Sequence, residues 1–118
     1  MAKVIKLRNK CQIYGTTFHD GVVCASMLEV EDKFGVQASI EGNSKVNFEL
    51  DLEVDGTPFT IYDWKEGLIT KGTVVWFHIG TRTEGSTKKV VEILKNDYNL
   101  TAKCETHEET LARYGIKL

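Results

Sequence analysis

Residues 46–62 read VNFELDLEVDGTPFTIY, and this stretch decides the fold class. Its first nine residues are apolar at every second position, with Asn or an acidic residue between them. Because successive side chains of a strand point to opposite faces, the alternation predicts an antiparallel strand with one buried and one solvated face. Asp55-Gly56 favours a tight hairpin turn, so the aromatic and β-branched residues 59–64 are expected to form the returning strand.

A second apolar run predicts a central strand. Residues 73–79 (TVVWFHI) are apolar on both faces apart from His78, which is typical of a strand that is covered on both sides. Shorter strands are expected at residues 4–7, 11–14, 36–40 and 100–104.

Three helices are predicted from capping residues and apolar spacing. The first and third each begin with a capping box, in which a Ser or Thr and a Glu three residues later satisfy free backbone N–H groups, and each has a Gly at its end. The second has apolar residues spaced to bury one face. The expected helices are 26–35, one that begins at Ser86 or Thr87 and continues through Leu94, and 106–115.

Together these elements predict an α+β fold, an antiparallel-dominated sheet with two or three helices packed on one face. The strand order is left open. The chain has 118 residues, of which 42% are hydrophobic, and this is enough for one core. Since no linker or repeat interrupts the chain, residues 1–118 are expected to form a single domain.

Charge and cysteine usage exclude several classes of protein. Fifteen Lys and Arg against seventeen Asp and Glu give a net charge of −2, which is unlike a typical nucleic-acid binder, so no DNA or RNA partner is expected. Three Cys without a C-x-x-C pair argue against a disulfide framework and fit a reducing compartment. Without an apolar stretch of membrane-spanning length or a secretory signal, we expect no membrane contact and a cytoplasmic location.

The first candidate site is the connection between the predicted central strand and the second helix, residues 79–88 (IGTRTEGSTK). The free N–H groups and the dipole of a helix start favour anions, and hydroxyls and cations nearby would strengthen such a site. The spacing matches neither a P-loop nor a dinucleotide fingerprint, and an ordinary strand-to-helix connection would use similar residues. The residues we expect to hold an anion are Gly80, Arg82, Ser86, Thr87 and Lys88.

The second candidate site is an aromatic wall on the two predicted strands. Tyr62 and Trp64 share one strand face, and Trp76 and His78 share another, so paired strands would gather these rings beside the Gly80 loop. Aromatic faces stack on nucleotide bases, and an anion site close by would complete a nucleotide site. The alternative is that Trp76 and Phe77 are core residues and His78 is a hydrogen-bonded, buried imidazole.

No residue has the quality of a catalytic or metal motif. His19, His78 and His107 lack metal-ligand spacing, so no metal and no cofactor are expected. His19-Asp20 would be a general base with an orienting carboxylate, or else part of a turn before Gly21. We therefore assign no catalytic residue and lean away from an enzyme.

Two segments carry a family resemblance, residues 60–65 (TIYDWK) and 76–80 (WFHIG). They resemble a group of small bacteriophage proteins in which a hairpin ending T-I-Y-(D/N)-(W/Y)-K precedes a strand ending W-H-I-G-G and a Lys-rich helix. The similarity covers residues 55–94, with Phe77 inserted and Thr81 in place of the second Gly. The resemblance implies a phage accessory protein in the host cytoplasm that acts against host defence, by binding a host protein or by sequestering a nucleotide signal.

We therefore expect a non-enzymatic protein that binds and sequesters a small anionic ligand, for example a cyclic nucleotide used as an immune signal. A homo-oligomer is expected, because a domain of this size forms a deep pocket most easily between subunits. Arg113 would either complement the dipole of the last helix or reach into a partner subunit's pocket. The alternatives are a protein–protein inhibitor of a host defence enzyme that acts through the hairpin at 55–56, and a small nucleotide hydrolase that uses His78 or His19.

Overall fold

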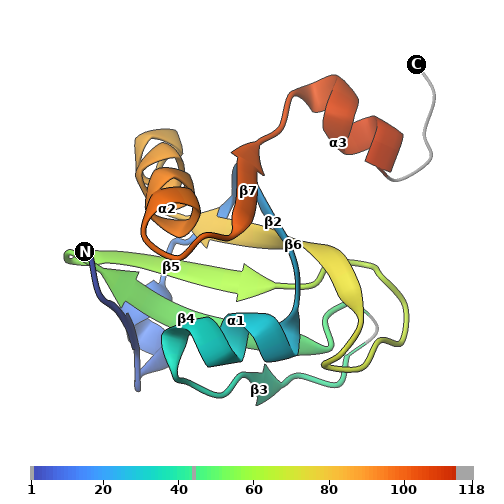
Figure 1. The fold of residues 1–118 in the computed structure, drawn as a ribbon, viewed down its shortest axis with the longest axis horizontal. Helices are drawn as coiled ribbons and strands as arrows, with labels where there is room; N and C mark the ends of the chain where they lie inside the picture. Colours follow the sequence, from blue (N-terminus) through green and yellow to red (C-terminus); the bar gives the residue numbers. More distant parts are fainter. Residues whose placement is uncertain (1, 44, 114–118) are drawn as a thin grey trace.

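The computed structural model describes residues 2–43 and 45–113. In this part of the chain it has seven strands, three α-helices and one 3₁₀ helix (Figure 1). The strands are β1 (Val4–Lys6), β2 (Thr17–Ser26), β3 (Ser39–Ile40), β4 (Phe48–Val54), β5 (Thr57–Tyr62), β6 (Val74–Thr81) and β7 (Thr101–Cys104). The helices are α1 (Met27–Phe34), α2 (Glu84–Asn96) and α3 (His107–Arg113), and the 3₁₀ helix is η1 (Lys10–Ile13).

The strands form one antiparallel sheet in the order β1-β4-β5-β6-β2-β7, and β3 pairs with β4 beside β1. Strand β6 lies between β5 and β2, which confirms that it is central. The α+β class predicted from the sequence is therefore confirmed. Within the described ranges, no helix is both long and apolar enough to cross a membrane.

The alternation in β4 separates two faces of the sheet. Phe48, Leu50, Leu52 and Val54 are buried, whereas the acidic residues between them are half-buried on the opposite face. The buried face meets α1 and α2, so we call it the helix face and the other the open face. Side chains from both helices join the core cluster, which includes Val23, Met27, Val30, Leu50, Leu52, Phe59, Ile61, Phe77, Ile79, Val90, Val91 and Leu94. Helix α3 buries none of its described side chains and follows β7 away from this core (Figure 1).

The hairpin between β4 and β5 forms as its sequence predicts. Asp55 and Gly56 have φ of 50° and 77°, and two consecutive positive φ values define the turn whose twist matches paired strands. Val54 pairs with Thr57 across the turn. This two-residue turn sets the register for the whole hairpin.

The helix caps explain where the helices begin. The Ser26 hydroxyl accepts a hydrogen bond from the Glu29 N–H, which is one half of the predicted capping box, and Gly35 ends that helix with φ of 67°, as predicted. The prediction that α2 begins at Ser86 or Thr87 is wrong by two or three residues, because the Thr83 hydroxyl is the cap and accepts from the Ser86 N–H.

Helix α3 also begins as predicted. Thr106 and Glu109 form a reciprocal capping box, in which each side chain accepts from the other residue's backbone N–H. The predicted end of this helix at Gly115 lies outside the described residues.

Three predictions for the N-terminal part are corrected. The strand predicted at residues 11–14 is the 3₁₀ helix η1, whose start is capped by the Asn9 side chain. The turn predicted before Gly21 is instead a register shift inside β2, where Asp20 has φ of 69°. That irregularity breaks the period of two, which is why the ten-residue strand β2 was not predicted. The strand predicted at residues 36–40 is reduced to Ser39–Ile40.

Candidate functional site

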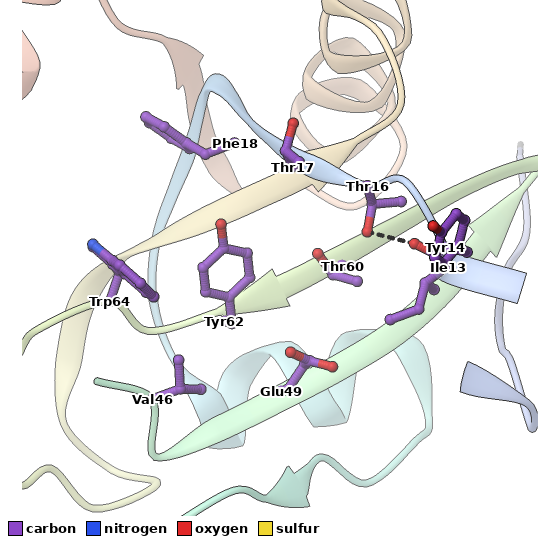
Figure 2. A pocket seen from close by; sticks show the side chains of 10 residues that line it. All are labelled: Ile13, Tyr14, Thr16, Thr17, Phe18, Val46, Glu49, Thr60, Tyr62 and Trp64. Atoms are coloured by element: carbon purple, nitrogen blue, oxygen red, sulfur yellow. Dashed lines mark hydrogen bonds between the residues drawn. The ribbon is translucent and has the colours of Figure 1, made fainter. Parts of the chain in front are cut away.

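A pocket of about 520 Å³ lies on the open face of the sheet (Figure 2). Strands β4 and β5 form its floor, and the segment that connects η1 to β2 forms its rim. The pocket is lined by Ile13, Tyr14, Thr16, Thr17, Phe18, Val46, Glu49, Thr60, Tyr62 and Trp64. Hereafter we call this the open-face pocket.

The hairpin register places two of these side chains together. Glu49 and Tyr62 are direct cross-strand partners, and Tyr62 is in turn paired with His78 of β6. Because neighbours across a sheet project to the same face, these three side chains share the open face. Figure 2 shows Tyr62 between Trp64 and Glu49, with the carboxylate of Glu49 directed toward the open-face pocket.

Four aromatic rings form one cluster at this position. Phe18 stacks on His78 with ring centroids 4.0 Å apart, and Tyr62 meets both His78 and Trp64 edge to face, at 5.6 Å and 6.3 Å. Such offset-stacked and edge-to-face pairs are the favourable arrangements of aromatic rings. We call Phe18, Tyr62, Trp64 and His78 the aromatic wall. Three of the four also line the open-face pocket, whereas His78 lies behind them.

Two exposed lysines bring positive charge to the aromatic wall. The Nζ atoms of Lys45 and Lys65 lie 5.6 Å and 5.7 Å from the centroid of the Trp64 ring. Within about 6 Å, the face of an indole attracts an ammonium group. Glu49 is the charged side chain among the pocket-lining residues, so the open-face pocket has a carboxylate on its floor and two ammonium groups beside Trp64.

His78 is the buried member of the aromatic wall, with 4% of its surface exposed. Its Nε2 lies 3.1 Å from Nη2 of Arg113. Because a guanidinium only donates hydrogen bonds, Nε2 accepts and the proton of the neutral ring is on Nδ1. Burial, together with the Arg113 charge, lowers the pKa of His78 from 6.5 to about 4. The interpretation of His78 as a hydrogen-bonded, buried imidazole agrees with this geometry.

Arg113 is held within its own chain. Its Nη2 donates to Oε1 of Glu105 at 2.9 Å and its Nε donates to Oε2 at 3.0 Å, a two-point ion pair with a carboxylate side chain that is 3% exposed. Glu105 also accepts from the Thr110 hydroxyl. Arg113 therefore attaches α3 to the sheet and lies behind the aromatic wall.

The Gly80 loop is not arranged as one anion site. Arg82 donates from Nε to the Tyr14 carbonyl and from Nη2 to the Gln12 carbonyl, both at 3.0 Å, so its guanidinium holds η1 at the rim of the open-face pocket. Gly80 packs so closely against Thr60 and Tyr62 that a Cβ atom would collide with the Thr60 hydroxyl.

The other loop residues lie on the helix face. Thr87 is fully buried, and its hydroxyl is 2.6 Å from that of Thr81. Ser86 belongs to the first turn of α2 and Lys88 is exposed on that helix. The sheet therefore separates Ser86, Thr87 and Lys88 from the aromatic wall, and the structure does not bring the two predicted halves of the site together.

Trp76 lies on the open face but outside the open-face pocket. It is half-buried beside α3, where the Nζ of Lys103 is 5.2 Å from its ring centroid and 2.7 Å from Glu109. Trp76 lines a second pocket there, of about 390 Å³, together with Lys103, Glu105, Glu109 and Arg113. The alternative interpretation placed both Trp76 and Phe77 in the core. The structure confirms this for Phe77, whereas Trp76 is not part of the core cluster.

Of the residues that line the open-face pocket, sequence reasoning predicted Tyr62 and Trp64 and missed the others, Phe18 and Glu49 among them, as well as the neighbouring Lys45 and Lys65. Across residues 2–43 and 45–113, no group of three or more His, Cys, Asp or Glu could hold a metal ion. His19, considered as a general base, lies on the exposed part of β2, with Nε2 3.2 Å from the Thr17 hydroxyl.

The fold and the site define a class: an antiparallel α+β protein with an aromatic pocket on the open face of its sheet. Comparisons of the chain with protein-family models, with curated protein sequences and with solved structures found no match. The functional argument therefore depends on the geometry of the pocket.

Proposed function

We propose that the chain is a non-enzymatic binding protein that captures a small anionic ligand with a planar ring, such as a nucleotide, in the open-face pocket. The observation that carries this proposal is the aromatic wall with two lysines beside it. A base that stacks on the Trp64 or Tyr62 ring gains about 1–3 kcal/mol. The volume of about 520 Å³ is in the range of small-molecule sites.

The charges give the ligand an orientation. With a net charge of −2, the chain has no general attraction for anions, so recognition has to be local. Phosphate groups would lie near Lys45 and Lys65, and the ring would cover Tyr62 toward the floor of the pocket. Arg82 contributes by holding the rim, and Arg113 by holding His78 within the aromatic wall.

The resemblance to phage accessory proteins makes a nucleotide immune signal, such as a cyclic nucleotide, the natural ligand of this proposal. The protein would then act by sequestration in the host cytoplasm. A homo-oligomer belongs to the same proposal, because a second copy would cover the open side of the pocket and bury more of the ligand.

Ligand release and binding test the proposal. Protein purified from infected cells is heat-denatured and the supernatant is analysed by mass spectrometry, and stripped protein is titrated with a nucleotide panel by calorimetry. We expect a released nucleotide and stoichiometric binding without turnover. Trp64→Ala should weaken binding about 5-fold to 100-fold, as expected for one lost stacking contact.

The chain supplies its own matched control. Trp76→Ala removes the other tryptophan, which lies beside α3 and outside the open-face pocket, and should leave the affinity unchanged. Lys45→Ala with Lys65→Ala should reduce both the affinity and its dependence on salt, whereas Lys88→Ala, on α2, should change neither. No released ligand and no binding across the panel would contradict the proposal.

The same experiments separate the two alternatives. A hydrolase would convert the nucleotide, and we rank it last because the His78 ring is 4% exposed and faces Arg113 rather than the open-face pocket. A protein–protein inhibitor would instead co-purify with one host protein and lose it on substitution of the Asp55-Gly56 hairpin, with Trp64→Ala having no effect.

A further inference from the structure

We propose that the Thr60 hydroxyl holds the polar edge of the ligand's ring, and that the open-face pocket therefore takes purine nucleotides in preference to pyrimidine nucleotides. This inference rests on the proposed function, since it requires that a nucleotide binds in the open-face pocket with its phosphate beside Lys45 and Lys65.

Thr60 is a buried polar residue on the floor of the open-face pocket. It is 4% exposed, yet it lines the pocket, where Figure 2 shows it between Tyr62 and the rim. Its hydroxyl makes no hydrogen bond with any group that the structure describes. Because a buried hydroxyl without a partner costs free energy, a ligand that supplies the partner is favoured.

The other two threonines of the open-face pocket use their hydroxyls within the chain. Thr16 donates to the Ile13 carbonyl at 2.8 Å, and the Thr17 hydroxyl lies 3.2 Å from Nε2 of His19. Thr60 is therefore the threonine of this pocket whose hydroxyl is left for a ligand.

Gly80 makes room for the Thr60 hydroxyl. The two residues are cross-strand partners, and a Cβ atom at position 80 would collide with the hydroxyl. The same Cβ atom would lie 3.5 Å from Cε1 of Tyr62, so the Thr60 hydroxyl and the edge of the Tyr62 ring border one small recess above Gly80. A base that packs on the Tyr62 ring therefore has its edge beside Thr60.

The distance between the two ends of the site favours a base with two rings. Trp64, Tyr62 and Thr60 follow one another along the pocket floor (Figure 2). The ring centroids of Trp64 and Tyr62 are 6.3 Å apart, and Thr60 lies two strand residues further on, which adds about 7 Å. A nucleotide whose phosphate meets the lysines beside Trp64 therefore has to reach past Tyr62. The second ring of a purine carries its polar edge further from the sugar than the single ring of a pyrimidine does.

A hydroxyl fits the edge of either purine. Because it both donates and accepts hydrogen bonds, the Thr60 hydroxyl can pair with the carbonyl group of guanine or with the amino group of adenine. The selection is therefore between ring sizes and not between adenine and guanine.

The test measures affinities by calorimetry with the 5′-monophosphates of adenosine, guanosine, cytidine and uridine. Wild-type protein should bind the two purine nucleotides more tightly. Thr60→Val keeps the shape of the side chain without its hydroxyl, and should weaken purine binding about 2-fold to 10-fold, as expected for one lost hydrogen bond, with pyrimidine binding unchanged. Thr60→Ser keeps the hydroxyl and should keep the purine preference. Since purines also stack more strongly, the loss confined to purines in Thr60→Val is the decisive result.

The matched control is Thr57→Val, on the same strand but on the helix face. Thr57 accepts a hydrogen bond from Lys89 of α2 and lies outside the open-face pocket, so this variant should leave all four affinities unchanged.

Thermal unfolding separates a binding role of the Thr60 hydroxyl from a structural one. The melting temperature of ligand-free Thr60→Val should match that of the wild type, because the hydroxyl has no described partner to lose. A lower melting temperature, equal weakening of all four nucleotides or no weakening at all would overturn the inference and leave the proposed function standing. Failure of every nucleotide to bind wild-type protein would overturn both.

Discussion

Lowering the pH should destabilise the folded chain through His78. Burial and the Arg113 charge lower the pKa of this imidazole from 6.5 to about 4, so the folded state disfavours the protonated ring. The stability that comes from keeping the ring neutral is present above the unfolded-state pKa of 6.5. This stability is lost as the pH falls from 6.5 toward 4, because in this range His78 is protonated in the unfolded chain but stays largely neutral in the folded chain.

The magnitude follows from the two pKa values. Each pKa unit corresponds to about 1.4 kcal/mol. At pH 4.5 the imidazole of the unfolded chain is almost fully protonated, while about three quarters of the folded chain keeps it neutral, which favours unfolding by roughly 2 kcal/mol relative to pH 7. The change in the free energy of unfolding is measured by urea denaturation at half-unit pH steps from 7.5 to 4.5.

His78→Gln isolates this contribution from that of the carboxylates. The Gln side chain can still accept from Arg113 through its amide oxygen but does not titrate in this range. Both proteins share Glu105 and the other acids, so the difference between their stability profiles reports His78 alone. Wild-type protein should lose roughly 2 kcal/mol more than the variant between pH 7 and pH 4.5. Parallel profiles would refute the assignment of a buried, neutral imidazole held by Arg113.

Three further changes test the fold around the site. Asp63→Asn should lower the free energy of unfolding by about 2–3 kcal/mol, measured by urea denaturation. The fully buried Asp63 carboxylate accepts from the backbone and side-chain N–H groups of Asn47 and from the backbone N–H of Phe48. The NH2 group of an Asn at this position would face these donors. Gly80→Ala should lower the melting temperature and distort the open-face pocket, because the added Cβ would collide with the Thr60 hydroxyl. Unchanged stability together with unchanged ligand binding would contradict this close packing. Ser26→Ala should cost about 1 kcal/mol through loss of the α1 cap, read from the same denaturation curves, and an unchanged unfolding midpoint would exclude the cap.

Much of the fold could be predicted because local signals agree with the tertiary structure. The β4 alternation, the Asp55-Gly56 turn and the capping residues each act over a few residues, and each element they predict is present. Strand β2 could not be found in this way. Its shift of register near Asp20 interrupts the period of two, so residues 17–26 show no single alternation that would predict a strand.

The site was predictable in part, and one missed residue was within reach. A two-residue turn at 55–56 pairs residues whose numbers sum to 111, so the sequence already places Glu49 opposite Tyr62. The contacts of His78 with Phe18 and Arg113 were not predictable, because they join distant parts of the chain. The two predicted halves of the site were separated because Thr81 and Thr87 bury their hydroxyls together on the helix face.

The buried imidazole also connects the open-face pocket to helix α3. Phe18 lines the pocket and stacks on His78, and His78 accepts from Arg113, which is held in place by Glu105. Since α3 buries none of its described side chains, it is attached to the sheet by polar contacts, namely these contacts of Arg113 and the ion pair of Glu109 with Lys103. A protonated His78 would repel Arg113 and lose its acceptor at once. Phe18, which lines one side of the pocket, therefore stacks on an imidazole that also accepts a hydrogen bond from the Arg113 guanidinium.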